Sequence, residues 1–176
     1  MGKIICIDAR MWGIKHTGIG RYVEELVDNL PGEVVLIVSP EVVNEPKLAK
    51  FKKFYAKFHP YSFIAQLEMI WLLLQIQPDL LHVPHFTIPV LWWGKLVITI
   101  HDLIKHYSRG SDTTTHQAGV YWLKYCLYLF IVWFAVNRAD HIIVPSQYWK
   151  DILISKFKLI QSKISVTYEA VSSIYR

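Results

Sequence analysis

The sequence predicts an α/β domain in which a parallel sheet is covered by helices on both faces. Short, almost continuously apolar runs such as 34–38 alternate with longer segments of helical character, and strands buried on both faces have this appearance. The chain has 176 residues, which suits one domain, so residues 1–176 are expected to form a single unit. With 53% hydrophobic and 19% charged residues, a disordered or collagen-like chain is excluded.

The expected elements follow one another along the chain. Apolar runs bounded by turn residues predict strands, and longer apolar segments closed by Pro or Gly predict helices. Strands are expected over residues 4–8, 33–39, 79–83, 96–100, 141–144 and 164–167. Helices are expected over residues 18–30, 63–77, 116–137 and 146–157, the last with Ser146 as its N-cap, and loops over 9–17, 84–95 and 105–115.

The longest apolar run, 119–136, approaches the roughly 18 to 20 residues that a membrane span needs, but it contains Lys124. A buried core helix is therefore expected, with interfacial and membrane-embedded helices as alternatives. Cys6 and Cys126 both lie in apolar runs and are expected to be small buried hydrophobes in a reducing compartment. Residues 1–8 are too short and strand-like for a secretory signal, so a cytoplasmic chain is expected.

A lysine-rich segment over residues 47–61 predicts a basic amphipathic helix on an anionic membrane surface, because its aromatic residues have helical spacing. An ordinary surface helix whose aromatic side chains pack inward is the alternative. The formal net charge is +5, with the basic excess in the second half, which suits an anionic partner. No nucleic-acid-binding motif is present, so nucleic acid is not expected as a partner. The proposed membrane-surface residues are Lys50, Lys52, Lys53 and Lys57.

Polar residues follow the predicted strands at their carboxyl ends, where open parallel sheets bind ligands. Gly18 and Gly20 lie between the first strand and the first helix, where backbone N–H groups and a helix N-terminus favour a diphosphate. A dinucleotide fingerprint would have a third glycine where Val23 stands, and its glycines would directly follow the strand. A nicotinamide- or flavin-dependent oxidoreductase is therefore only an alternative.

Histidines are the other candidates for chemistry. His101 ends a predicted strand and can act as a hydrogen-bond donor or proton relay. His82 is expected to make a structural hydrogen bond, whereas His85 and His101 are expected to face the cleft. No set of Cys or carboxylate residues completes a zinc site, so no metal is expected. The sequence has no nucleophile elbow, Walker loop or Asp-x-Asp pair, which disfavours hydrolases and kinases.

Five segments, taken in order, resemble a known family. They are Ile7-Asp8-Ala9-Arg10, Thr17-Gly18-Ile19-Gly20-Arg21-Tyr22, Leu81-His82-Val83-Pro84-His85-Phe86, Thr99-Ile100-His101-Asp102-Leu103 and Ala139-Asp140-His141-Ile142-Ile143-Val144-Pro145-Ser146. The chain resembles the amino-terminal half of retaining family 4 glycosyltransferases (GT4), which have the two-domain GT-B fold. It looks most like bacterial mannosyl- and rhamnosyltransferases of surface polysaccharide assembly. The resemblance implies a Rossmann-like amino-terminal domain on the acceptor side.

The resemblance also implies roles for individual residues. Gly18 and Gly20 would lie against the donor diphosphate and sugar, with Arg21 beside them, and His101 would be the catalytic residue at the reacting centre. The expected partners are a nucleotide-sugar donor and a glycan or lipid-linked acceptor, with no metal or other cofactor. The residues expected to line the cleft or the acceptor site are His85, Asp102 and Ser146.

One departure from the family pattern shapes the functional expectation. Family members carry a second Rossmann-like domain that binds the donor through a Glu-x7-Glu motif, and this sequence lacks it. We therefore expect an acceptor-side half that is incomplete or inactive without a donor-binding domain or subunit. A separate subunit predicts an exposed apolar face, with Trp92 and Trp93 or the aromatic tail as its candidates. The alternative function is a noncatalytic membrane-associated or protein-binding module. The expected location is the cytoplasm, with peripheral attachment to the inner face of the cell membrane.

Overall fold

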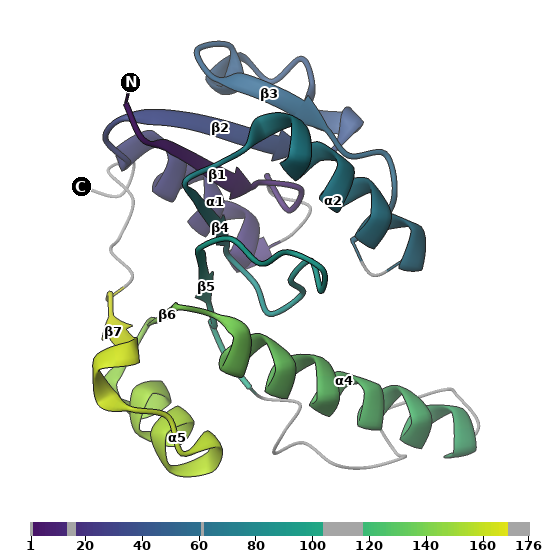
Figure 1. Cartoon of the computed structure of the whole chain (residues 1–176), viewed down its shortest axis with the longest axis vertical. Helices are drawn as coiled ribbons and strands as arrows, with labels where there is room; N and C mark the ends of the chain where they lie inside the picture. Colours follow the sequence, from purple (N-terminus) through teal and green to yellow (C-terminus); the bar gives the residue numbers. More distant parts are fainter. Residues whose placement is uncertain (1, 14–16, 61, 104–117, 169–176) are drawn as a thin grey trace.

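A computed structural model describes residues 2–13, 17–60, 62–103 and 118–168, which form one sheet flanked by helices (Figure 1). The strands are β1 (Ile4–Asp8), β2 (Glu33–Val38), β3 (Lys52–Tyr55), β4 (Leu80–Val83), β5 (Leu96–Thr99), β6 (His141–Val144) and β7 (Ile164–Val166). The α-helices are α1 (Thr17–Asn29), α2 (Phe63–Ile76), α4 (Ala118–Arg138) and α5 (Gln147–Phe157). The strand order is β3-β2-β1-β4-β5-β6-β7, and every pair is parallel. The predicted parallel α/β fold is confirmed.

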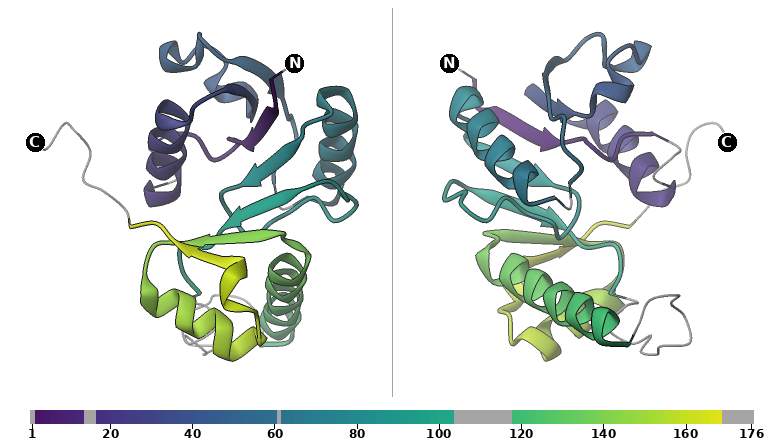
Figure 2. Two further views of the ribbon diagram at one scale, coloured as in Figure 1. Left: turned by 60° about the vertical axis from the view of Figure 1, so that its left-hand side comes forward. Right: turned by 90° about the vertical axis from the view of Figure 1, so that its right-hand side faces the viewer.

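Two apolar clusters fill the two sides of the sheet. The larger cluster joins α2, α4 and α5 to the strands through Leu73, Val132 and Leu153. The smaller cluster joins α1 to the strands through Val23 and Val27. Figure 2 shows α1 on one side of the sheet and α2 and α4 on the other. This division follows from right-handed crossovers. After α1 the chain moves across the sheet in the direction of β3, whereas after each of the other helices it moves in the direction of β7, so the helices fall on opposite faces.

Local hydrogen bonds fix where two of these helices begin. Ser62 caps α2 by accepting a hydrogen bond from the backbone N–H of Ala65 at 3.2 Å. Ser146 caps α5 in the same way, accepting from Trp149 at 3.3 Å, as the sequence predicted. A serine oxygen at this position satisfies one of the unpaired N–H groups of the first turn. The helix starts are therefore encoded locally.

The predicted amphipathic helix over residues 47–61 is wrong. A short 3-10 turn over Pro46–Leu48 is followed by β3, an edge strand that pairs with β2. Aromatic residues suit a strand as well as a helix, and the edge of β2 offers backbone hydrogen bonds to a strand over residues 52–55. Lysines on such an edge hinder pairing with another chain. Lys50 lies 3.3 Å from Asp28 of α1, so it belongs to the α1 side of the sheet.

The long helix α4 differs from the buried core helix that was expected. Its inner side, which includes Val132 and Val136, is buried, but Phe130 on its outer side is exposed. Cys126 is exposed as well, so the expectation that both cysteines are buried is wrong for this one. Cys6 is buried as predicted, and burial raises the pKa of its thiol. No helix within the described ranges combines the length and apolarity needed to cross a membrane.

Two adjacent leucines of α2 test whether one side of this helix packs against the sheet while the other side is exposed to solvent. Leu73→Ala should lower the free energy of unfolding by about 2–5 kcal/mol, because Leu73 is fully buried in the larger cluster. Leu74→Ala is the matched control and should change it by less than about 0.5 kcal/mol, since Leu74 is 64% exposed. Urea unfolding followed by circular dichroism measures both values. Equal losses would contradict the assigned orientation of α2.

Candidate functional site

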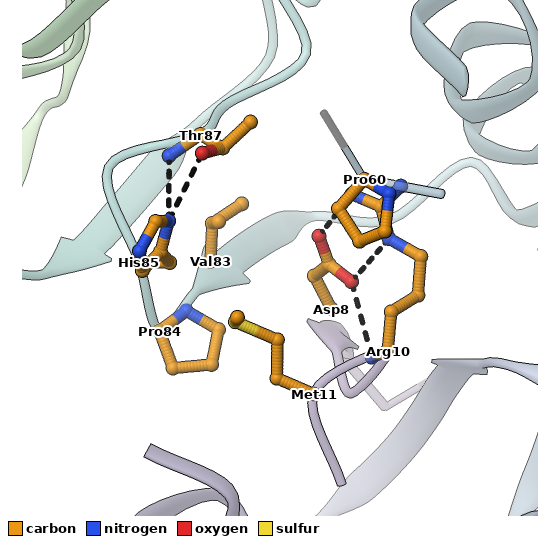
Figure 3. A pocket seen from close by; sticks show the side chains of 8 residues that line it. All are labelled: Asp8, Arg10, Met11, Pro60, Val83, Pro84, His85 and Thr87. Carbon is orange, nitrogen blue, oxygen red and sulfur yellow. Dashed lines mark hydrogen bonds and ion pairs between the residues drawn. The ribbon is translucent and has the colours of Figure 1, made fainter. Parts of the chain in front are cut away.

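Three adjoining pockets occupy the carboxyl edge of the sheet. The central pocket, only about 10 Å³, is lined by Asp8, Arg10, Met11, Pro60, Val83, Pro84, His85 and Thr87 (Figure 3). The histidine pocket, about 160 Å³, is lined by Ile19, His85, Phe86, Thr99, His101, Asp102 and Tyr128. The β3-side pocket, about 510 Å³, is lined by Arg10, Met11, Ser39, Pro40, Glu41, Ala56, Lys57, Phe58, His59 and Pro60. Shared residues make the three pockets neighbours along one edge.

A buried ion pair stands at the end of β1. Arg10 donates to Asp8 through Nε at 2.8 Å and through Nη2 at 2.6 Å, and the two side chains are only 4% and 8% exposed. Burial alone would lower the pKa of Arg10, but the Asp8 carboxylate, together with that of Glu68, outweighs burial and raises it. The third nitrogen, Nη1, is buried and has no hydrogen-bond partner among the residues that the structure describes. The guanidinium lies beside Pro60 in Figure 3, so this pair places a donor between the central and β3-side pockets.

A chain of side chains connects α1 to the histidine pocket. His82 Nε2 lies 2.9 Å from the Thr99 hydroxyl, which lies 3.1 Å from the Tyr22 hydroxyl. Burial, followed by the nearby His101 imidazole, lowers the pKa of His82 to about 4. His82 is therefore neutral at physiological pH and has the structural hydrogen bond that the sequence analysis expected. The Tyr22 ring in turn meets the His101 ring edge-on, with ring centroids 4.6 Å apart.

The two candidate glycines have different surroundings. A Cβ atom at Gly20 would overlap the carbonyl oxygen of Gly13 and lie 2.9 Å from that of Met11. Gly20 is thus required where the loop after β1 crosses the first turn of α1. A Cβ atom at Gly18 would meet no atom of the described residues within 4 Å. Gly18 lies in the first turn of α1, where backbone N–H groups favour an anion.

Of the remaining predicted site residues, two line the pockets and two lie elsewhere. His85 lines both the central and the histidine pocket, and its Nδ1 lies 3.0 Å from the Thr87 hydroxyl. Asp102 lines the histidine pocket beside His101. Arg21 lies on α1 and lines none of the three pockets. The Ser146 hydroxyl caps α5 instead of lining a pocket.

The basic segment is divided in the same way. Lys57 lines the β3-side pocket, whereas Lys52 and Lys53 lie within β3 and Lys50 pairs with Asp28. The four lysines therefore do not form one surface.

Within the ranges that the structure describes, no group of three or more His, Cys, Asp or Glu side chains is placed to hold a metal ion. That transfer needs no metal or other cofactor stays a prediction.

Sequence reasoning missed several pocket residues. Tyr128 of α4 lines the histidine pocket, and burial, followed by the Asp102 carboxylate, raises the pKa of its hydroxyl. Phe58 and His59 line the β3-side pocket directly after β3. The rule that ligands collect at strand carboxyl ends would have found these two residues if 52–55 had been interpreted as a strand.

The fold and this edge define the chain as a Rossmann-like α/β domain with its candidate ligand site at the strand carboxyl ends. The family follows from the sequence: the chain belongs to Glycosyltransferase Family 4, whose family model matches residues 16–173. The resemblance to family 4 glycosyltransferases is confirmed, and the family replaces the oxidoreductase alternative. No curated protein sequence matches the chain.

Two solved structures share the fold. A glycosyltransferase from Rickettsia africae ESF-5 is 13% identical with a TM-score of 0.52, over 98% of this chain and 44% of that one. The lipopolysaccharide outer core galactosyltransferase WaaB, in its apo form, is 15% identical with a TM-score of 0.53, over 97% of this chain and 46% of that one. The chain thus spans less than half the length of either protein.

The neutral state of His82 has a measurable consequence for stability. Its pKa in the folded chain, about 4, lies below the ordinary histidine value of 6.5, so the unfolded chain takes up a proton first as the pH falls. Stability should therefore decrease from pH 7 to pH 5 by about 2 kcal/mol on account of this residue. His82→Gln should lack that part of the decrease. Urea unfolding at both pH values measures it, and parallel decreases in the two proteins would show that His82 is not held neutral.

Proposed function

We propose that this chain is the acceptor-side half of a retaining glycosyltransferase, which moves a sugar from a nucleotide-sugar to a glycan or lipid-linked acceptor together with a donor-binding half. Membership of Glycosyltransferase Family 4 supports glycosyl transfer. The observation that carries the proposal for this site is the contact between Tyr22 and His101, which places the start of α1 beside the histidine pocket. An anion-binding helix terminus and a hydrogen-bonding imidazole therefore share one small space.

The chemistry of transfer suits this arrangement. The bond between the anomeric carbon and the diphosphate oxygen breaks, and the acceptor oxygen bonds to the same carbon. Negative charge develops on the departing diphosphate, and preorganised backbone N–H groups at a helix N-terminus stabilise such charge. The first turn of α1, which contains Gly18 and Gly20, is the diphosphate site in this proposal. His101, beside Asp102, is positioned to hydrogen-bond the sugar at the reacting centre.

The role of His101 is tested in a joined enzyme, in which this chain is fused to the part of WaaB that it does not cover. His101→Ala should lower sugar transfer by about 100-fold or more, the usual effect of removing one donor at a reacting centre. His141→Ala is the matched control, because His141 bonds Ser165 outside the three pockets, and should keep full activity. Release of nucleoside diphosphate from UDP-, GDP- and dTDP-sugars measures transfer. Unchanged turnover in His101→Ala would remove its assigned role.

The outer sides of α2 and α4 favour a second role, peripheral attachment to a membrane. Gln66 of α2 binds the loop after β4 through the carbonyl of Ile88 and the N–H of Val90. Arg138 of α4 binds the same loop through the carbonyls of Trp92 and Gly94. The three segments thus present one surface, the aromatic face, on the side of the sheet opposite α1. Its exposed residues are Phe63, Ile64, Leu67, Trp71, Leu74, Val90, Leu91, Trp93, Trp122, Leu123, Leu127, Phe130 and Trp133.

The composition of the aromatic face suits an anionic lipid surface. The outer side of a helix in water is normally polar, yet α4 has a single charged residue, Lys124, between Trp122 and Trp133. Tryptophan prefers the boundary between hydrocarbon and headgroups. Trp93 is 80% exposed, as the sequence analysis anticipated, and the Arg138 guanidinium lies over its ring, whereas Trp92 packs against the larger cluster. Basic groups beside an apolar surface attract anionic headgroups.

Binding to phosphatidylglycerol vesicles distinguishes this surface from the lysines of the 47–61 segment. The double variant Trp71→Glu and Trp133→Glu should bind at least about tenfold more weakly, because each substitution removes an apolar anchor and adds repulsive charge. Replacement of Lys50, Lys52, Lys53 and Lys57 by Gln should have little effect, since Lys50 lies on the α1 side. Tyr148→Glu on α5 is the control, and co-sedimentation measures binding.

The reverse result, with binding lost only in the lysine variant, would assign the membrane surface to the basic segment. Vesicle binding without transfer in the joined enzyme, with any of the nucleotide-sugars, would instead favour a noncatalytic membrane-associated module.

A further inference from the structure

The β3-side pocket lies apart from the proposed reacting centre. It forms where β1, β2 and β3 end, because its walls come from Arg10, Ser39 and Phe58, which follow those strands. Its volume, about 510 Å³, exceeds the 160 Å³ of the histidine pocket and lies within the range of small-molecule sites. The central pocket stands between the two. A ligand that reaches from one to the other would therefore be extended along the edge of the sheet.

The charges of this pocket are balanced. The positive charge of Arg10 is met by the bidentate Asp8 carboxylate, and the lining includes both Glu41 and Lys57. A site for a phosphate would carry an excess of positive charge directed at the anion. The balance found here suits an uncharged ligand that is rich in hydrogen-bonding groups.

One buried atom supplies a donor for such a ligand. Arg10 Nη1 has no hydrogen-bond partner within the described part of the chain, although its side chain is only 4% exposed. Buried donors are almost always paired, because an unpaired one loses its hydration without compensation. The bond to Asp8 holds the guanidinium in place, so Nη1 keeps a fixed direction. Arg10 lines both the central and the β3-side pocket, so a ligand oxygen that is admitted beside its guanidinium would complete the hydrogen bonding of Nη1.

Phe58 supplies an apolar platform in the same pocket. Its side chain is 44% exposed and lines the wall together with Pro40 and Pro60. Glu68 of α2 accepts hydrogen bonds from the backbone N–H groups of Lys57 and Phe58, at 2.8 and 3.1 Å. The turn after β3 is thereby fixed, and the ring is preorganised. The C–H groups on one face of a pyranose ring are slightly positive and pack well on the negative face of an aromatic ring.

We propose that the β3-side pocket binds an uncharged sugar residue of the acceptor, stacked on Phe58 and hydrogen-bonded by Arg10 Nη1. Ser39, Glu41 and His59 provide further hydrogen-bonding groups at its wall. The inference rests on the proposed function, because it names a glycan as the acceptor. It places the recognised sugar at a distance from the reacting centre, on the far side of the central pocket.

Saturation-transfer NMR on the 176-residue chain tests the site with the methyl glycosides of glucose, galactose, mannose and rhamnose, and with glycerol 3-phosphate. At least one glycoside should bind with a Kd on the order of a few millimolar, as expected for so small a ligand. Phe58→Ala should weaken this binding about five- to tenfold. Tyr148→Ala, which removes an exposed aromatic ring on α5, is the matched control and should leave the Kd unchanged.

Arg10→Lys provides a second variant, because it keeps a positive charge beside Asp8 but removes the fixed Nη1 donor. It too should weaken glycoside binding, with folding checked by circular dichroism. The proposal is overturned if no glycoside binds, if binding is the same in Phe58→Ala, or if glycerol 3-phosphate binds more tightly than every glycoside.

This experiment separates the inference from the proposed function. Transfer by the joined enzyme without Phe58-dependent glycoside binding would reject the sugar site alone. Phe58-dependent binding without transfer would support the site and reject the proposed function.

Discussion

Parallel pairing of the strands is the constraint on which the rest of the structure depends. It places all carboxyl ends along one edge, so the polar residues that follow β1, β4 and β5 become neighbours although they are far apart in sequence. It also requires every chain reversal to be made by a crossover, and the crossover helices provide the cover for both faces. The candidate site and the two cores thus have one origin.

The strands that are buried on both faces of the sheet are the part of the fold that the sequence predicts well. The strands equivalent to β1, β2 and β6 were predicted within about one residue, because strands buried on both faces contain almost no polar residues. The edge strand β3 was mistaken for a helix because its lysines and aromatics satisfy either periodicity, whereas the other edge strand, β7, was predicted within one residue. Likewise, the apolar sequence of α4 does not tell which side meets the sheet, so the exposure of Cys126 came only from the structure.

The candidate site divides in a similar way. His101 and Gly20 were accessible to sequence reasoning, because a polar residue after an apolar strand and a glycine before a helix are local signals. The bond between Asp8 and Arg10 is also local, but its burial depends on which strands flank β1. Phe58 joins Arg10 only through the position of β3 at the far end of the sheet. A contact that depends on the order of the strands in the sheet leaves no local pattern in the sequence.

The position of Cys126 allows the chain to be labelled at one natural site on α4. The sequence has only two cysteines, and Cys6 is inaccessible, with a thiol whose pKa is raised by burial. A thiol-reactive fluorophore would therefore attach at one natural position, on the exposed side of α4. An environment-sensitive dye placed there would change its emission when that side passes from water into a less polar medium. The unmodified sequence thus allows the surroundings of α4 to be followed directly in cell extracts, vesicles or complexes.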